Sequence, residues 1–459
     1  MMASGAPRQL PYGVGGARVH ETTVQSSGPF CEDGAVTVRA LSTLPADELT
    51  EFRTAQKTAY DALIARGLSL DLTRGKPSSA QLDLSDGLLG LPSTTKDASG
   101  ADVRNYGGLA GITEIRSMFA ELLNIETDQI VAQGNSSLAL MREVLTFLML
   151  KGALDSPAPW VGQKVKFLCP VPGYDRHFAL LEWLGIEMIP IPMNADGPDA
   201  DAAAALAVND AAIKGIWVVP TYANPTGDVT SVEVATKLVS MPTAAPDFKI
   251  FWDNAYALHH LTSAETKSAD VISLAHVAGN PHRPIMFAST SKITYAGAGV
   301  AFLATSKEQI AWYSDHLGFG TIGPDKVNQL RHVEFFKDAA GVRAHMGKHR
   351  ELLAPKFAEL SRILDERLTG YDVATWTNPA GGYFISLDVL DGTASRVIEL
   401  AKGAGVALTP AGSAFPYKKD PNDRNIRLAP SLPPIAEVTG AAEVVATCVL
   451  LAAAEKLIA

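Results

Sequence analysis

Lys292 is the residue whose surroundings point most directly to chemistry. It follows a short apolar segment, 284–288, and three small hydroxyl residues, Ser289, Thr290 and Ser291. A lysine taken at random is usually a solvated surface residue. In an apolar setting of small residues, however, its ammonium is partly desolvated, and a lysine amine that attacks a carbonyl group needs such a setting. The segment therefore predicts a lysine that forms a Schiff base with its ligand.

Three further motifs place polar or aromatic side chains after segments that are predicted to be strands. Asp253 follows the segment 248–252, with Tyr256 three residues on, and either caps the next helix or faces a cationic ring nitrogen. Asn224 stands before Pro-Thr-Gly, either as a turn residue or as a hydrogen-bond donor to a ligand oxygen. Tyr174 either packs in the core or stacks on a planar cofactor. Each motif alone leaves both interpretations open.

Two other motifs could bind anions. Gly134, Asn135 and Ser136 open a predicted helix. Its free N–H groups and dipole favour a phosphate, although Asn135 or Ser136 could equally be a simple N-cap. Arg427 stands in an apolar stretch, and a buried guanidinium needs a carboxylate partner. That partner is either an internal Asp or Glu or a substrate.

Predicted strands alternate with predicted helices over the first part of the chain. This order favours a mainly parallel sheet with helices on both faces. In such sheets ligands bind at the carboxyl ends of the strands, which is where these motifs fall. We expect helices at 48–65, 112–123, 136–150 and 177–184, and strands at 164–169, 187–191, 213–219, 248–252, 284–288 and 298–304.

After residue 325 the pattern changes to that of a smaller α+β domain. The stretch 325–368 contains few helix breakers and predicts one long helix. Strands are expected at 371–376 and 383–387, and helices at 393–404 and 435–458. These patterns divide the chain into a flexible N-terminal arm (1–42), an N-terminal part of the small domain (43–75), a large domain (76–325) and a small C-terminal domain (326–459).

The composition limits the possible functions. The chain of 459 residues carries a formal net charge of −10 and no dense run of Lys or Arg, so nucleic acid is not an expected partner. Its three cysteines are widely spaced, which indicates neither a disulfide framework nor a metal site. No apolar run is long enough to span a membrane, and the N-terminus lacks a secretory signal. We therefore expect a cytoplasmic protein without metal. A nicotinamide-dependent dehydrogenase is disfavoured because no G-x-G-x-x-G follows an early strand.

Taken together, the motifs resemble those of a known family. Asn-Pro-Thr-Gly at 224–227, Asp-Asn-Ala-Tyr at 253–256, Ser-Thr-Ser-Lys at 289–292 and the Arg427 segment occur in this order. The set resembles the class I aminotransferases of fold type I, which use pyridoxal 5′-phosphate (PLP), and the type Ic branch of aspartate aminotransferases in particular. The resemblance covers roughly residues 45–459. It implies an α/β fold, with a mainly parallel sheet of seven strands between helices and a smaller α+β domain.

The resemblance also implies roles around the cofactor. Lys292 is expected to hold PLP covalently and later to transfer the substrate proton. Asp253, supported by His177, is expected to pair with the pyridinium nitrogen and keep the ring able to accept electrons. The other expected contacts are Tyr256 and Asn224 at the phenolic oxygen, Tyr174 stacked on the ring, Gly134, Asn135, Ser136 and Ser289 at the phosphate, and Tyr106 at the phosphate of the neighbouring subunit of a homodimer.

The same resemblance implies the substrate contacts. They are Arg427 at the α-carboxylate, Gly75 and Asn224 beside it, and Lys76 or Arg74 at the distal carboxylate of a dicarboxylic substrate. One position departs from the family. Val300 stands eight residues after Lys292, where the family has a phosphate-binding arginine. The phosphate is therefore expected to rely on backbone dipoles and hydroxyl groups.

The implied reaction is a ping-pong transamination between amino acids and 2-oxo acids, with L-aspartate and 2-oxoglutarate as the expected pair. An aromatic or alanine aminotransferase on the same scaffold is the near alternative. A non-catalytic PLP-binding regulator is an alternative from another class. The N-terminal stretch rich in Gly, Pro and Ala argues against it, because such a sequence does not form a DNA-binding domain.

Overall fold

The structure is a computed structural model that describes residues 39–459. The expected flexible arm, 1–42, thus lies almost wholly outside the described residues. Its last residues enter a short 3-10 helix, Leu41–Thr43, whose Leu41 is fully buried. Residues 39–459 form one compact unit, so the domain boundaries drawn from the sequence stay predictions.

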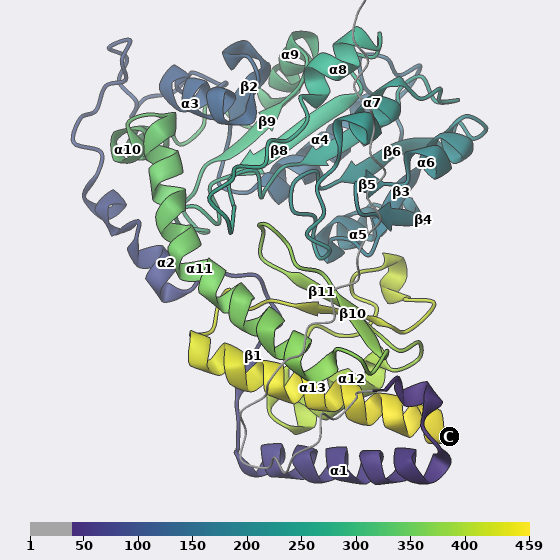
Figure 1. Cartoon of the computed structure of the whole chain (residues 1–459). Helices are drawn as coiled ribbons and strands as arrows, with labels where there is room; N and C mark the ends of the chain where they lie inside the picture. Colours follow the sequence, from purple (N-terminus) through teal and green to yellow (C-terminus); the bar gives the residue numbers. More distant parts are fainter. Residues whose placement is uncertain (1–38) are drawn as a thin grey trace, which may run out of the picture. The chain divides into compact units, whose positions relative to one another are not determined.

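A large sheet dominates the first part of the described chain (Figure 1). Its parallel strands are the apolar segments expected from the sequence, and β9 runs antiparallel to both of its neighbours. The family resemblance predicted seven strands, and the structure adds a two-residue eighth, β5, antiparallel to β4. The order is β2 (Ile130–Ala132), β9 (Ala301–Ala304), β8 (Pro284–Ser289), β7 (Lys249–Asp253), β6 (Ile213–Val218), β3 (Lys166–Val171), β4 (Glu187–Asn194) and β5 (Gly197–Pro198).

Helices cover both faces of this sheet because its strands are apolar on both sides. In β7, Ile250 and Trp252 belong to one hydrophobic core and Phe251, between them, to the other. This alternation is the period of two that a strand imposes. The first core includes α3 (Thr113–Leu123), α6 (Ala200–Ala207), α7 (Val232–Ser240) and α8 (Val271–Val277), and the second includes α4 (Ser137–Lys151), α5 (Asp175–Trp183) and α9 (Lys307–Leu317).

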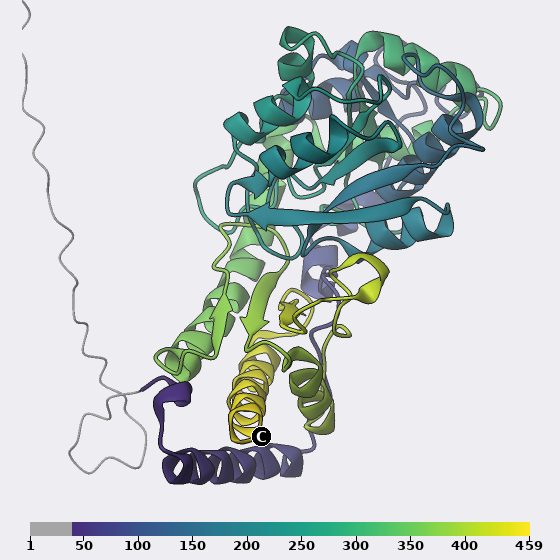
Figure 2. The same ribbon diagram turned by 90° about the vertical axis from the view of Figure 1, so that its right-hand side faces the viewer.

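A separate hydrophobic core lies in the part of the chain that contains both ends of the described sequence. Figures 1 and 2 show α1 beneath α13, and Figure 1 shows β10 and β11 beside the helices. The elements are α1 (Ala46–Ala65), α11 (Ala339–Leu368), α12 (Ala394–Gly403) and α13 (Ile435–Ile458), the antiparallel strands β10 (Ala374–Trp376), β11 (Ile385–Val389) and β13 (Asn425–Leu428), and the parallel pair β1 (Leu70–Asp71) and β12 (Val406–Ala407).

The expectation of one helix over 325–368 is wrong. The structure has two helices, α10 (Lys326–Phe336) and α11, with a break at Lys337 and Asp338. Lys337 adopts a left-handed φ of 71°, and the Asp338 carboxylate accepts a hydrogen bond from the Gly341 N–H at 2.8 Å. Asp338 is thus the N-cap of α11. The turn is so tight that a side chain at Gly341 would have its Cβ 1.8 Å from the Phe336 carbonyl oxygen.

Helix α13 corrects a second expectation. By length and composition it could cross a membrane, whereas the sequence was expected to hold no such segment. Yet 72% of its most apolar stretch is buried inside the protein, and Val445 and Cys448 are fully buried. The helix expected at 435–458 is therefore a core helix of the protein.

Buried charges lie at the amino ends of the central strands, away from the motifs. Lys214 in β6 pairs with the fully buried Asp247 at 2.7 Å. Trp160 and Ser156 also donate hydrogen bonds to Asp247, each at 2.7 Å. Burial alone would raise the pKa of Asp247, but these donors hold the pKa below its usual value. The carboxylate therefore stays charged and supplies the partner that the buried ammonium of Lys214 needs.

We predict that Asp247→Ala lowers the free energy of unfolding by about 3–5 kcal/mol, because it leaves Lys214 buried without its partner. Denaturant unfolding monitored by circular dichroism measures this loss. The matched control is Asp201→Ala, which removes an exposed ion pair with Lys237 and should change stability by about 1 kcal/mol or less. Equal effects of the two substitutions would contradict the prediction.

Candidate active site

The carboxyl ends of the central strands bring the sequence motifs together. Asp253 is the last residue of β7, Ser289 is the last residue of β8, and Lys292 follows three residues later. Tyr174 follows β3 and Asn224 follows β6. These strands are neighbours in the sheet, so the loops after them meet at one edge.

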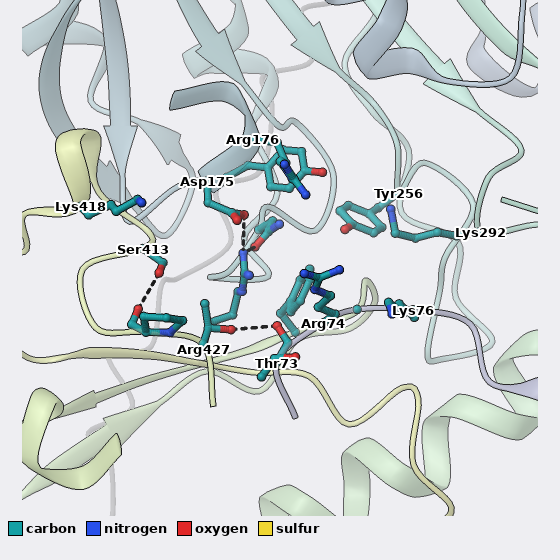
Figure 3. A pocket seen from close by; sticks show the side chains of 16 residues that line it. Thr73, Arg74, Lys76, Asp175, Arg176, Tyr256, Lys292, Ser413, Lys418 and Arg427 are labelled. Carbon is teal, nitrogen blue, oxygen red and sulfur yellow. Dashed lines mark hydrogen bonds and ion pairs between the residues drawn. The ribbon is translucent and has the colours of Figure 1, made fainter. Parts of the chain in front are cut away.

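Two adjoining cavities open at this edge. The outer cavity has a volume of about 540 Å³ and the inner one about 190 Å³. Both are lined by Tyr174, Asn224, Tyr256 and Lys292, so these residues stand at their junction. Figure 3 shows Lys292 and Tyr256 on one side of the outer cavity and Arg427 near its centre.

A buried carboxylate with an incomplete set of partners lies in the inner cavity. Asp253 is 4% exposed, and its Oδ2 lies 2.9 Å from Nε2 of His177. The His177 ring is stacked on Trp217, with ring centroids 4.1 Å apart. The other carboxylate oxygen, Oδ1, is buried and has no hydrogen-bond donor. A buried carboxylate oxygen needs such a donor, and a protonated ring nitrogen supplies one.

Aromatic rings surround the Lys292 amine. Its Nζ lies 4.9 Å from the centroid of the Tyr256 ring and 5.9 Å from that of Tyr383. Burial raises the pKa of Tyr256 above its ordinary value, and the charge of Asp253 raises it further. Burial likewise raises the pKa of Tyr174 to about 12. Both phenols are therefore neutral at physiological pH and can donate hydrogen bonds to a ligand.

Hydroxyl groups form the other end of the inner cavity. Ser136, Ser137, Ser289 and Ser291 line it, and Ser136 is the N-cap of the 15-residue helix α4. No arginine lines this cavity among the described residues. The Val300 side chain, at the position of the family's arginine, is 1% exposed and packs in the hydrophobic core. Hydroxyl groups and a helix N-terminus can together hold a phosphate.

Two residues that were expected at the phosphate do not line the inner cavity, although the carbonyl oxygen of Asn135 accepts a hydrogen bond from Ser291, which does. Gly134 and Asn135 line a neighbouring cavity of about 240 Å³, not the cavity that contains Lys292. The Asn135 side chain donates a hydrogen bond to the carbonyl oxygen of Gly297 at 2.8 Å. Tyr106 lines neither of the two site cavities and is 80% exposed.

Arg427 on β13 reaches the outer cavity and has an internal acid as partner. Its Nη1 donates hydrogen bonds to Asp175 at 2.9 Å and to Asn224 Oδ1 at 3.3 Å. Its guanidinium carbon lies 4.9 Å from the centroid of the Phe384 ring. The buried Nε has no partner. The guanidinium is therefore held in place while donors remain for a carboxylate ligand.

The outer cavity is rich in cations. Arg74 and Lys76 line it, as the sequence suggested, and Gly75 lies between them close to Phe384. Arg176 and Lys418 also line it and were missed. Arg176 has a local signal, since it follows Tyr174 and Asp175 in the Pro-Gly-Tyr-Asp-Arg-His motif. No local sequence pattern marks Lys418, because its loop is far in the sequence from the other residues of the site.

The first turn of α5 serves four parts of the site at once. Tyr174 lines both cavities, and Asp175 pairs with Arg427. Arg176 supplies a cation to the outer cavity, and His177 pairs with Asp253. Four consecutive residues thus connect the inner carboxylate to the outer cationic cavity.

A mainly parallel sheet with a lysine just beyond β8 and a buried Asp at the end of β7 is the arrangement of the PLP-dependent enzymes of fold type I. The family model described as aspartate amino-transferase matches residues 44–459. The chain therefore belongs to this family and is a PLP-dependent aminotransferase.

Known relatives agree with this assignment. The chain is 54% identical over 419 residues to an aspartate aminotransferase from Corynebacterium glutamicum, covering 91% of this chain and 97% of the relative. A crystal structure of an aspartate transaminase from C. glutamicum matches with a TM-score of 0.90 and 54% identity, over 91% of this chain and 99% of the other. LysN, an α-aminoadipate aminotransferase from Thermus thermophilus solved with N-(5′-phosphopyridoxyl)-L-leucine, shares the fold, with a TM-score of 0.68 and 20% identity, over 86% and 95% of the two chains.

Proposed function

We propose that this aminotransferase transfers the amino group of L-aspartate to 2-oxoglutarate. The observation that carries the proposal is the charge of the outer cavity, which is lined by a single carboxylate, Asp175, and besides Lys292 by the cations Arg74, Lys76, Arg176, Lys418 and Arg427. A dicarboxylic substrate brings two negative charges and needs more than one cation. The C. glutamicum relative named aspartate aminotransferase supports the same substrate.

The inner cavity suits PLP by its chemistry. Asp253, through its unpartnered Oδ1, would accept the hydrogen of the pyridinium nitrogen. Tyr256 and Asn224 would hydrogen-bond the phenolic oxygen, Tyr174 would lie against the ring, and Ser136 and Ser289 would bind the phosphate. When bound, PLP supplies an electron sink for the carbanion that forms when the substrate loses its α-proton.

The residues of the chain position the substrate and move its proton. Arg427 would bind the α-carboxylate through its remaining donors. One or more of Arg74, Lys76, Arg176 and Lys418 would hold the distal carboxylate. The Lys292 amine, once free, would remove the α-proton as a general base and return it as a general acid.

We further propose a homodimer located in the cytoplasm. Tyr106 is exposed in a single chain, as a residue that completes the phosphate site of a partner subunit would be. The backbone of Tyr106 accepts a hydrogen bond from Lys326. A few residues before Lys326 in the sequence, the side chains of Phe319 and Ile322 are 94% and 61% exposed. Large exposed apolar side chains of this kind are typical of protein interfaces.

The visible absorption spectrum of the purified protein tests the cofactor and the substrate together. We expect the band of the pyridoxal form to convert to that of the pyridoxamine form when L-aspartate is added, and to return with 2-oxoglutarate. Conversion by L-phenylalanine or L-alanine but not by L-aspartate would replace the substrate. A protein that stays colourless with added PLP would contradict the cofactor assignment.

A further inference from the structure

Five buried polar residues form a connected group beside the Lys292 backbone. We call Gln81, His259, His345, His349 and Tyr383 the histidine network. Each is at most 5% exposed. Gln81 lies in α2 (Ser79–Asp83), and His259 lies in the segment after β7. His345 and His349 lie in α11, and Tyr383 lies just before β11. Polar groups this deeply buried are unfavourable unless they are hydrogen-bonded.

Three members of the network contact the backbone of the lysine loop. His345 donates a hydrogen bond through Nε2 to the carbonyl oxygen of Ile293 at 2.8 Å. His259 Nε2 lies 3.3 Å from the carbonyl oxygen of Lys292, and the Tyr383 hydroxyl donates to the same oxygen at 3.5 Å. Two successive carbonyl groups at the lysine are therefore held by side chains from distant segments.

The remaining contacts link these side chains to one another. Gln81 Nε2 donates to the Tyr383 hydroxyl at 3.0 Å and lies 3.1 Å from Nδ1 of His349. His349 Nε2 in turn lies 3.1 Å from Nε2 of His345. Burial, together with the smaller effect of the neighbouring His345, lowers the pKa of His349 to about 4. His349 is thus neutral, so its Nδ1 can accept the hydrogen bond from Gln81 and its hydrogen lies on Nε2. Because Nε2 of His345 also carries a hydrogen, which it donates to Ile293, the approach of the two Nε2 atoms is a packing contact and not a hydrogen bond.

Helix α11, which carries His345 and His349, belongs to both cores of the protein. Val342 and Met346 pack in the core of the large sheet, whereas Leu360 and Leu364 pack in the core around α13. Figure 1 shows α11 running from the helices beside the large sheet to α13. The network therefore connects the lysine backbone to the element that the two cores share.

We propose that the histidine network is a positioning device, in which His345, packed against His349, fixes the carbonyl group of Ile293 to α11 and thereby sets the place of the neighbouring lysine amine. The inference rests on the proposed role of Lys292. An apolar cluster could fill the same space without hydrogen bonds. Only donors and acceptors, however, can define the orientation of two carbonyl groups, and small displacements of a catalytic group reduce rates strongly.

The test compares two substitutions at one position in the holoenzyme. His345→Phe keeps a ring but removes the donor to Ile293, and should lower kcat about 10- to 100-fold with little change in KM. It should also speed amide hydrogen exchange in a peptide covering 289–300. His345→Gln retains an N–H donor and should recover most of both losses. The control is His282→Phe, which removes a hydrogen bond to Ser306 far from the site and should change neither readout.

A lower melting temperature for His345→Phe, with unchanged kcat and unchanged exchange at 289–300, would overturn the proposal and leave a packing role. If His345→Phe does not fold, Tyr383→Phe removes only a hydroxyl and should give a smaller effect of the same kind. Unchanged kcat and exchange in that variant would equally overturn the proposal. Hydrogen exchange requires no substrate, so its result stands even if L-aspartate is not the amino donor.

Discussion

Alanine in place of Lys292 is expected to abolish transamination. The loss of general acid–base catalysis alone should reduce kcat by about 10²–10⁴-fold. Loss of the amine that is proposed to hold the cofactor should reduce kcat further. No other lysine or histidine lines the inner cavity among the described residues, so the chain offers no substitute base there. Turnover of L-aspartate and 2-oxoglutarate, followed with purified protein, measures the effect.

The matched control for this substitution is Lys307→Ala. Lys307 is an exposed lysine that pairs with Asp128 at 2.6 Å, and its removal should leave kcat unchanged. If the Lys292→Ala protein kept most of the wild-type rate, Lys292 would have no part in the reaction. The assignment of the inner cavity as the PLP site would then be contradicted as well.

Asp253→Asn is expected to produce the second largest loss of activity. The amide has nearly the same shape as the carboxylate and keeps an oxygen for His177, but it removes the buried negative charge. Loss of a preorganised electrostatic partner of the reacting group reduces kcat by about 10²–10³-fold. The variant should still bind some PLP, because the lysine and the serines of the inner cavity are intact. Steady-state kinetics with saturating PLP separates weaker cofactor binding from a slower reaction.

The competing interpretation is that Asp253 only caps the segment that follows it. Asp270 provides the comparison, because its side chain is the N-cap of α8 and accepts a hydrogen bond from the Ser273 N–H at 3.0 Å. Asp270→Asn should lower stability by about 1 kcal/mol or less and leave kcat unchanged. If Asp253→Asn behaves in the same way, the carboxylate has no electronic role.

The sequence was informative where function depends on short local patterns. Lys292, Asp253 and Asn224 each follow an apolar strand, and neighbouring parallel strands necessarily bring their carboxyl ends to one edge. The break between α10 and α11 was missed, although Asp338 and Gly341 are an ordinary N-terminal helix signal. Few other breakers surround them, and the apolar periodicity on either side concealed the turn.

What could not be predicted depends on contacts between distant segments. Lys418 reaches the outer cavity from a loop more than two hundred residues beyond Tyr174. His345 meets Ile293 only because α11 packs beside the lysine loop. The partner of Arg427 was left open between an internal acid and a substrate, and only the folded chain brings Asp175, 252 residues away in the sequence, within 2.9 Å. No spacing within the sequence encodes these distances.

Four consecutive residues at the start of α5 contact different parts of the site, and this arrangement affects any attempt to change the substrate preference. Because Tyr174, Asp175, Arg176 and His177 share one stretch of backbone, a substitution that shifts this turn alters cofactor electronics and carboxylate recognition together. The effects of paired substitutions there will not add, since neighbours in one network are energetically coupled. Redesign of the preference is better begun with the side chain of Lys418, which lines the outer cavity but not the inner one. The backbone of its loop should be left unchanged, because the carbonyl oxygen of Ala414 accepts a hydrogen bond from the N–H of Gly173, next to Tyr174, at 2.8 Å.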